Sequence, residues 1–309
     1  MLLMVNKLTK CYGSYTAVNG ISFAVPKGKV IGLLGPNGAG KTTTIQMLLG
    51  ITLHNGGTIN YFGLDFVKHR QACLQRINFA SSFNTLQGRI SVWENLLVFA
   101  DLYQVVKPKR KIMELVRYFQ IEELLPKRFW DLSSGQKTRV NLVKALINDP
   151  ELILMDEPTA SLDPDIADKL LSLIEQLRRE RQLSLVYTSH DMAEVARICD
   201  EVIFLDHGNI VAHDTPLGLT KRITHSQFTI SFDGDKSLVS KTLTGYQLAY
   251  EFVNPFTVVV TITEPLIPKV IFKLSETGIW ITNMEIKKPT LADVFLQIAR
   301  GAYDFTKTN

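Results

Sequence analysis

The sequence predicts an α/β protein with a mixed-sheet core, an inserted helical subdomain and a small C-terminal α+β domain. Apolar residues at three- and four-residue spacing between about 83 and 150 favour helices. From residue 221 to 309 strand and helix patterns alternate over the length of a small domain. Short apolar runs that lead into helical sequence indicate buried parallel strands crossed by helices; they lie at residues 29–35, 151–158 and 183–190.

We therefore expect a first domain over 1–220 and a second over 221–309. In the first, alternation predicts a strand at 17–25, and a helix follows the next strand over 41–50, ending at Gly50. Further helices are expected at 91–103, 109–119, 133–149, 163–180 and 191–200. In the second domain we expect strands at 226–232, 246–253, 256–263 and 279–286, and helices at 265–277 and 289–300.

Composition bounds the class of protein. The 309 residues are 46% hydrophobic, and 34 basic against 30 acidic residues give a net charge of +4, too mild for a nucleic-acid-binding protein. Three widely spaced cysteines fit a reducing compartment. No apolar run reaches the roughly 18 residues of a membrane span, and the start lacks a secretory signal. We expect an intracellular protein that reaches a membrane only through a partner.

The segment GPNGAGKT, residues 35–42, fits the phosphate-binding pattern G-x-x-x-x-G-K-[ST] between a strand and a helix. Its glycines allow backbone N–H groups to surround a β-phosphate at a helix start. Lys41 would bridge the β- and γ-phosphates, and the Thr42 hydroxyl would ligate Mg²⁺. The alternative is a Gly-rich turn with a surface lysine. The expected phosphate-binding residues are Gly35, Pro36, Asn37, Gly38, Ala39, Gly40, Lys41, Thr42 and Thr43.

An acidic pair follows the apolar run LILM at a strand end. Asp156 would hold Mg²⁺, mainly through water. Because successive side chains at a strand end point in opposite directions, Glu157 should be free to orient or deprotonate a water molecule. The alternative is a pair of helix-capping acids.

A second anion-binding pattern is LSSGQ at residues 132–136. Ser133 can cap backbone N–H groups, and Gly135 allows a ligand to approach closely. Taken alone, the segment is a well-capped helix start.

With these three motifs in this order, residues 1 to about 220 resemble the nucleotide-binding subunits of ABC transporters. The resemblance implies a P-loop NTPase ABC cassette that hydrolyses ATP, and two cassettes closing head to tail over two nucleotides. In that family LSSGQ of one protomer contacts ATP held by the other, here through Ser133, Gly135 and Gln136. The family more often has Gly at the position of Ser134. A homodimer is expected.

Three further positions match the family. Tyr12 falls where an aromatic ring stacks on adenine, although Tyr15 is close and a core tyrosine is an alternative. His190 matches the switch histidine that hydrogen-bonds the γ-phosphate and places the attacking water. Asp163 matches the loop that crosses the dimer interface, and it also precedes a helix as a cap.

One position departs from the family. Ser82 stands where the family has a glutamine that touches Mg²⁺ and the attacking water. Ser82 could act through a bridging water, and Gln87 is a candidate substitute in the same loop.

The resemblance also implies an integral-membrane permease as partner, at the cytoplasmic face of the membrane. The C-terminal extension resembles those of cassettes that serve separately encoded exporter permeases, which favours export. A soluble ABC ATPase acting on ribosomes or nucleic acid is the alternative, although the paired cassettes and the long coiled coil of such proteins are missing. A P-loop kinase would leave LSSGQ without a role.

Overall fold

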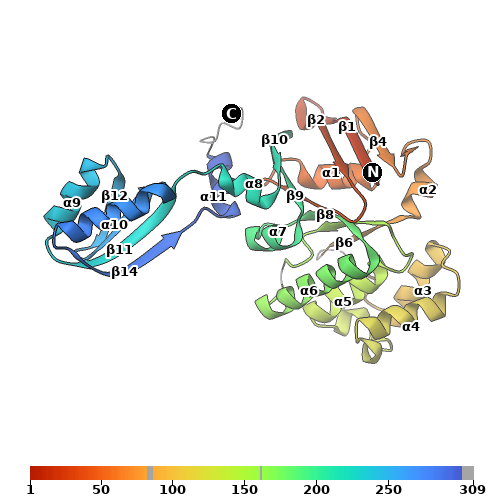
Figure 1. Ribbon diagram of the computed structural model, residues 1–309. Coiled ribbons are helices and arrows are strands. Elements are labelled where there is room, and N and C mark those ends of the chain that lie inside the picture. Colours follow the sequence, from red (N-terminus) through yellow and green to blue (C-terminus); the bar gives the residue numbers. More distant parts are fainter. Residues whose placement is uncertain (82–85, 161, 301–309) are drawn as a thin grey trace. The chain divides into compact units, whose positions relative to one another are not determined.

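The computed structural model describes residues 1–81, 86–160 and 162–300 (Figure 1). The chain divides into two compact units, the first over Met1–Pro216 and the second beginning at Leu217. Within the described residues no helix is long and apolar enough to cross a membrane.

The first unit contains two sheets. The smaller is antiparallel in the order β2-β1-β4-β5, and its strands are β1 (Leu3–Tyr12), β2 (Tyr15–Val25), β4 (Gly56–Tyr61) and β5 (Leu64–Asp65). The larger has the order β10-β9-β3-β8-β7-β6, with β3 (Val30–Leu34), β6 (Ile77–Ser81), β7 (Leu152–Asp156), β8 (Ser184–Thr188), β9 (Glu201–Asp206) and β10 (Asn209–Asp214). All its pairs are parallel except β10 with β9, so the expected mixed-sheet α/β core is confirmed.

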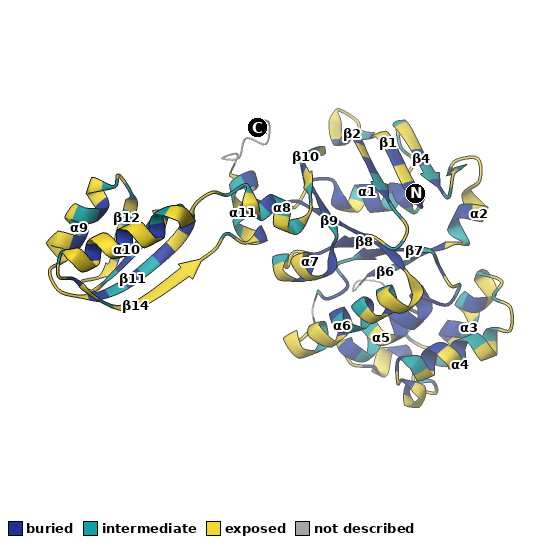
Figure 2. Ribbon diagram, in the orientation of Figure 1, coloured by how far each residue is buried: buried dark blue, intermediate teal, exposed yellow. Residues whose placement is uncertain are grey.

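Helix α1 (Lys41–Leu48) belongs to a core that includes residues of both sheets. Its buried Ile45 and Leu48 share one hydrophobic cluster with Leu3 and Val5 of β1 and Leu33 of β3. Strands β3 and β8 are buried along their whole length, as Figure 2 shows for the centre of this unit. Burial of both faces explains their continuous apolar sequence. This core fixes the loop that joins β3 to α1.

The remaining helices of this unit are α2 (Arg70–Leu74), α3 (Val92–Leu102), α4 (Pro108–Tyr118), α5 (Ser134–Ala145), α6 (Pro164–Arg181) and α7 (Met192–Ile198), followed by α8 (Pro216–Lys221) across the boundary. Between β6 and β7 lie α3, α4 and α5, as the helical periodicity predicted. Polar contacts join α4 to the end of α6: the Tyr118 hydroxyl donates to Glu180 at 2.8 Å, and Arg181 lies 3.5 Å from Glu114.

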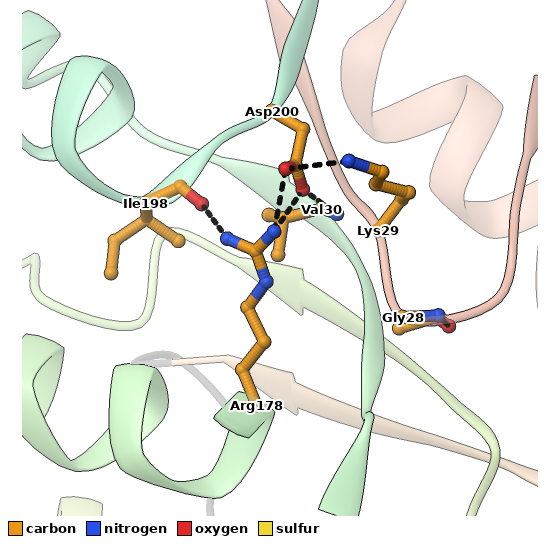
Figure 3. Close-up of polar contacts among 7 residues, drawn as sticks. Gly28, Lys29, Val30, Arg178, Ile198 and Asp200 are labelled. Carbon is orange, nitrogen blue, oxygen red and sulfur yellow. Dashed lines mark hydrogen bonds and ion pairs between the residues drawn. The ribbon is translucent and has the colours of Figure 1, made fainter.

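A polar cluster fixes the amino end of β3, opposite the end that leads to α1 (Figure 3). The carboxylate of Asp200 accepts hydrogen bonds from the Val30 backbone N–H at 2.8 Å, Arg178 at 2.5 Å and Lys29 at 3.2 Å. Burial opposes ionisation, but these hydrogen bonds lower the pKa of Asp200 below its usual value. Arg178 also donates to the Ile198 carbonyl, so the cluster joins α6, α7 and β3.

The second unit has its own antiparallel sheet in the order β12-β13-β11-β14, with β11 (Ser226–Asp233), β12 (Ala249–Asn254), β13 (Thr257–Ile262) and β14 (Trp280–Lys287). Alternate residues of β11 pack against α9 (Lys236–Gly245) and α10 (Ile267–Glu276) in a separate core; Phe228, Val239 and Leu274 are among its fully buried members. Helix α11 (Leu291–Ala299) follows β14. The expected strands and the helices at α10 and α11 are present, whereas α9 was not expected.

Candidate active site

The loop between β3 and α1 contains the predicted phosphate-binding residues. Gly35 and Gly40 have φ of 148° and 102°, which favour glycine. A Cβ at Gly35 would lie 2.2 Å from the Leu205 carbonyl oxygen, and one at Gly40 would lie 2.5 Å from that of Ala17. Gly38, at φ 83°, has open space around it. Two of the glycines are therefore required by packing as well as by conformation.

Lys41 bends back over this loop. Its Nζ donates to the carbonyls of Gly35 at 2.5 Å and Pro36 at 3.1 Å. Burial lowers the pKa of Lys41, and the negative charges of Glu157 and Asp156 act against that shift. The lysine therefore lies within electrostatic range of both predicted acidic residues.

The other predicted residues of this segment occupy the loop and the first turn of α1. Asn37 is exposed and Ala39 is buried; Thr42 is exposed at the helix start and Thr43 is half-buried. Backbone N–H groups at such a helix start favour a negatively charged ligand.

The acidic pair lies at the carboxyl end of β7. Asp156 ends the strand and accepts a hydrogen bond from the Thr188 hydroxyl at 2.5 Å. Glu157 is already outside the strand, with a left-handed φ of 50°. Its N–H donates to both the carbonyl and the hydroxyl oxygen of Thr188, each at 3.1 Å. The strand alternation that we expected to separate the two side chains ends at Asp156, so this left-handed turn sets the direction of Glu157.

His190 lies beside Glu157. Strands β7 and β8 are parallel, with Asp156 opposite Thr188, so the residues that follow each strand are neighbours. The His190 Nε2 is 2.6 Å from the Glu157 Oε1, and the exposed fractions of these side chains are 52% and 19%. Both residues line a cavity of about 460 Å³. The arrangement pairs a carboxylate with an imidazole at the sheet edge that also carries the phosphate loop.

Comparison with known proteins identifies the family. The profile described as ABC transporter matches residues 18–160. The chain is 30% identical over 305 residues to the linearmycin resistance ATP-binding protein LnrL of Bacillus subtilis (strain 168), covering 96% of this chain and 98% of the relative. It is 33% identical over 291 residues to the Nod factor export ATP-binding protein I of Rhizobium sp. (strain N33), covering 94% of each.

The chain belongs to the ATP-binding subunits of ABC transporters. A solved structure titled "Structure of ATP binding subunit of ABC transporter" is 26% identical, with a TM-score of 0.65 over 72% of this chain and 93% of that one. The chain thus has the ABC ATPase fold, binds ATP and is an ATPase of a transporter. Both relatives are named for resistance or export, so the ribosomal alternative has no support.

In this cassette the LSSGQ segment begins α5. Ser133 is the N-cap: its hydroxyl accepts from the Gln136 N–H at 3.3 Å, and the Gln136 side chain accepts from the Ser133 N–H at 3.1 Å. A Cβ at Gly135 would lie 3.0 Å from Ile166 of α6. Among the described residues no hydrogen bond or ion pair joins the segment to the phosphate loop of its own chain. Its contact with nucleotide stays a prediction.

Two tyrosines flank the hairpin of β1 and β2. They are opposite each other in register, Tyr12 with Tyr15, and both rings are substantially exposed. The Tyr12 ring lies under the Lys10 ammonium at 4.8 Å, and the Tyr15 hydroxyl donates to the Gly38 carbonyl at 3.3 Å. A buried core tyrosine is therefore wrong for both positions. Stacking of Tyr12 on adenine, with Tyr15 as the alternative, stays a prediction.

Of the other predicted positions, the structure describes Gln87 and Asp163 but not Ser82. Ser82 lies outside the described residues, although Ser81 before it pairs in register with Asp156. Gln87 is exposed, and its backbone exchanges hydrogen bonds with the Asn95 side chain. Asp163 is the N-cap residue of α6, but its side chain makes no capping hydrogen bond.

Sequence reasoning missed three buried polar residues of the first unit. Thr188 binds both Asp156 and Glu157. Glu194 is buried on α7, and Lys144 on α5 is 5% exposed and donates to the Phe79 carbonyl at 2.9 Å. A signal for the last two was present, because each charged residue stands at a core-facing position of its helix.

Proposed function

We propose that this ATPase powers export through a separately encoded integral-membrane permease, working at the cytoplasmic face of the membrane. The named roles of the two relatives support export. The observation that carries the catalytic part is the contact of 2.6 Å between Glu157 and His190 at the edge where the phosphate loop lies.

Each residue has a distinct part in hydrolysis. The phosphate loop and Lys41 hold the triphosphate, because backbone N–H groups and a cation neutralise its charge. Glu157 orients or deprotonates the attacking water. His190 hydrogen-bonds the γ-phosphate and helps to place that water in line with it. Phosphoryl transfer needs little covalent participation by the protein, so positioning and electrostatics supply most of the rate. Tyr12, with Tyr15 as the alternative, stacks on adenine.

Mg²⁺ fits the donor set. Thr42 is exposed at the start of α1, where its hydroxyl can reach a ligand. The carboxylate of Asp156 lies close enough to Lys41 to raise the pKa of that lysine, against the effect of burial. Hydroxyl and carboxylate oxygens are ligands that Mg²⁺ prefers. Bound there, the ion would neutralise charge on the β- and γ-phosphates. Ser82 is the third proposed contributor.

A second copy of the cassette completes each site. Ser133, Gly135 and Gln136 of one protomer bind the γ-phosphate held by the other, and Asp163 lies near the same interface. Support comes from the start of α5, where Ser133 caps the helix and Ser133 and Ser134 are exposed, because the amino end of a helix favours an anion. ATP then joins two cassettes, and release of phosphate separates them.

The variant Glu157→Gln tests this scheme. It should bind ATP but lose turnover by at least about 100-fold, the usual contribution of a general base. Sedimentation velocity with ATP and Mg²⁺ should then show an accumulated dimer. Glu201→Gln is the matched control, because Glu201 lies 2.8 Å from His213 in a second Glu–His pair. A monomer under the same conditions contradicts the scheme.

Affinity capture from detergent-solubilised membranes tests the partner. We expect an integral-membrane protein to co-purify, and co-purifying ribosomes would contradict the proposal. Separate Ser82→Ala and Gln87→Ala variants address the loop after β6. If neither changes turnover, that loop acts only mechanically.

A further inference from the structure

Glu194 is a buried acidic residue next to the catalytic pair. It lies on α7, four residues after His190, and is 8% exposed. One of its oxygens, Oε2, accepts three hydrogen bonds: from the hydroxyls of Thr159 at 2.8 Å, Ser189 at 2.8 Å and Tyr187 at 3.0 Å. A carboxylate taken out of water is costly unless donors surround it, and these three hydroxyls supply that environment.

The three donors come from the segments that carry Glu157 and His190. Thr159 follows Glu157 by two residues, in a turn where the Ala160 N–H donates to the Glu157 carbonyl at 3.2 Å. Ser189 immediately precedes His190, and its hydroxyl also accepts from the Asp191 N–H at 3.0 Å. Glu194 therefore joins the two segments behind the catalytic side chains.

The ion pairs between α6 and α7 provide a contrast. Arg197 binds Asp168 at 2.6 Å and Glu175 at 2.9 Å, which joins the two helices by exposed ion pairs. Within the part of the chain that the structure describes, no hydrogen bond or ion pair joins those pairs to the segments of Glu157 or His190. Holding the helices together and positioning the catalytic residues are thus performed by different groups.

We propose that Glu194 is a positioning residue for ATP hydrolysis, which holds the loop of Glu157 and the segment of His190 at the separation that lets the two side chains meet. The inference rests on the roles proposed above for those two residues. Glu194 contacts the two segments through the hydroxyls of Thr159 and Ser189, which lie close to the backbone. It therefore acts through Glu157 and His190 and does not itself contact the substrate.

Kinetics of Glu194→Gln provide the first test. Glutamine keeps the size of the side chain but removes the charge that three hydroxyl donors share, so kcat should fall at least about tenfold. KM for ATP should change less than about twofold, because the phosphate loop and Lys41 are untouched. Glu175→Gln is the matched control: it removes one bond between α6 and α7 and should leave kcat unchanged.

The imidazole ¹⁵N resonances of the protein without nucleotide provide the second test. The His190 signal, assigned by its loss in His190→Gln, should move in Glu194→Gln toward its position in Glu157→Gln. It should stay in place in Glu175→Gln. If Glu194→Gln does not fold, the double variant Thr159→Val/Ser189→Ala removes two of the donors and should move the same signal.

A purely structural role predicts a lower melting temperature with unchanged kcat per folded molecule and an unchanged His190 resonance, and that result overturns the inference. Failure of the underlying proposal is recognised separately. If Glu157→Gln and His190→Ala retain turnover, the proposed catalytic roles are wrong. If they lose turnover while Glu194→Gln retains it, only the positioning role is wrong.

Discussion

At the scale of single residues, Lys144 is a cation enclosed by the first unit. It donates to the Asn78 side chain at 3.2 Å and to the Phe79 carbonyl at 2.9 Å, linking α5 to β6. Burial lowers the pKa of Lys144 to about 8 from the usual 10.5. The folded protein therefore binds fewer protons than the unfolded chain between these two values.

The free energy of unfolding should accordingly rise with pH over that window. Below pH 8 both states carry the charge and the burial cost is fully present; above it the folded state sheds the proton. From pH 7.5 to 9.5 the gain attributable to Lys144 is about 2 kcal/mol. Urea unfolding of wild type and Lys144→Met at both pH values measures the difference. Equal pH dependence in the two proteins contradicts the assignment.

The phosphate loop offers a second prediction at this scale. Gly35→Ala combines a glycine-favouring φ with a clash against the Leu205 carbonyl, whereas Gly38→Ala meets only the conformational cost. That cost is about 1 to 2 kcal/mol. We expect chemical denaturation to show a larger loss for Gly35→Ala than for Gly38→Ala. Equal losses would mean that the loop relaxes away from Leu205.

The sequence predicted residues whose role depends on local spacing. The phosphate loop, the acidic pair and His190 each follow an apolar run that could be read directly, and parallel β7 and β8 bring the last two together. Glu194 could not be placed in this way, because its partner Thr159 is 35 residues distant and the contact forms only after three segments fold. Helical spacing could show that Glu194 faces the core, but not which distant residues it contacts there.

At the scale of elements, the start of α5 has both a capping role and a proposed binding role. Ser133→Ala removes the capping hydroxyl and should cost about 1 kcal/mol of stability. Ser133→Asp keeps a good cap but places a negative charge where the partner's γ-phosphate is proposed to bind. It should therefore retain stability while turnover falls at least tenfold. Thermal melting and ATPase assays separate the roles, and full activity in Ser133→Asp contradicts the binding role.

Helix α9 shows why one element escaped prediction. Its sequence KSLVSKTLTG is rich in Ser, Thr and Val, which have modest helix propensity. The cap comes from Asp235, whose carboxylate accepts from the Ser237 N–H at 2.7 Å. Packing of Val239 and Leu243 into the second core supplies the rest. Tertiary contacts thus override a weak local preference.

At the scale of the whole molecule, the two units have separate hydrophobic cores. The core around α1 and the core between α9, α10 and the β11 sheet are distinct clusters. We therefore expect calorimetry to show two unfolding transitions. ATP with Mg²⁺ at 100 times its dissociation constant should stabilise only the first unit, by about 2.7 kcal/mol.

Substitutions in each core assign the transitions. Leu274→Ala, in the second core, should cost about 2 to 5 kcal/mol and lower one transition. Leu154→Ala, in the first core, should lower the other by a similar amount. A single transition that responds to both variants contradicts the independence of the units.

Two of the contacts that join the helical region to the rest of the first unit differ in their exposure to ions. The contact of α4 with Glu180 and Arg181 is polar and lies at the surface, where mobile ions at physiological strength screen charges over about 8 Å. Lys144 holds α5 to β6 inside the protein, beyond such screening. Raising the salt concentration should hence weaken the contacts of α4 with Glu180 and Arg181 and leave the contact of Lys144 with β6 unchanged. Any movement of the helical region would then occur about its buried attachment at Lys144.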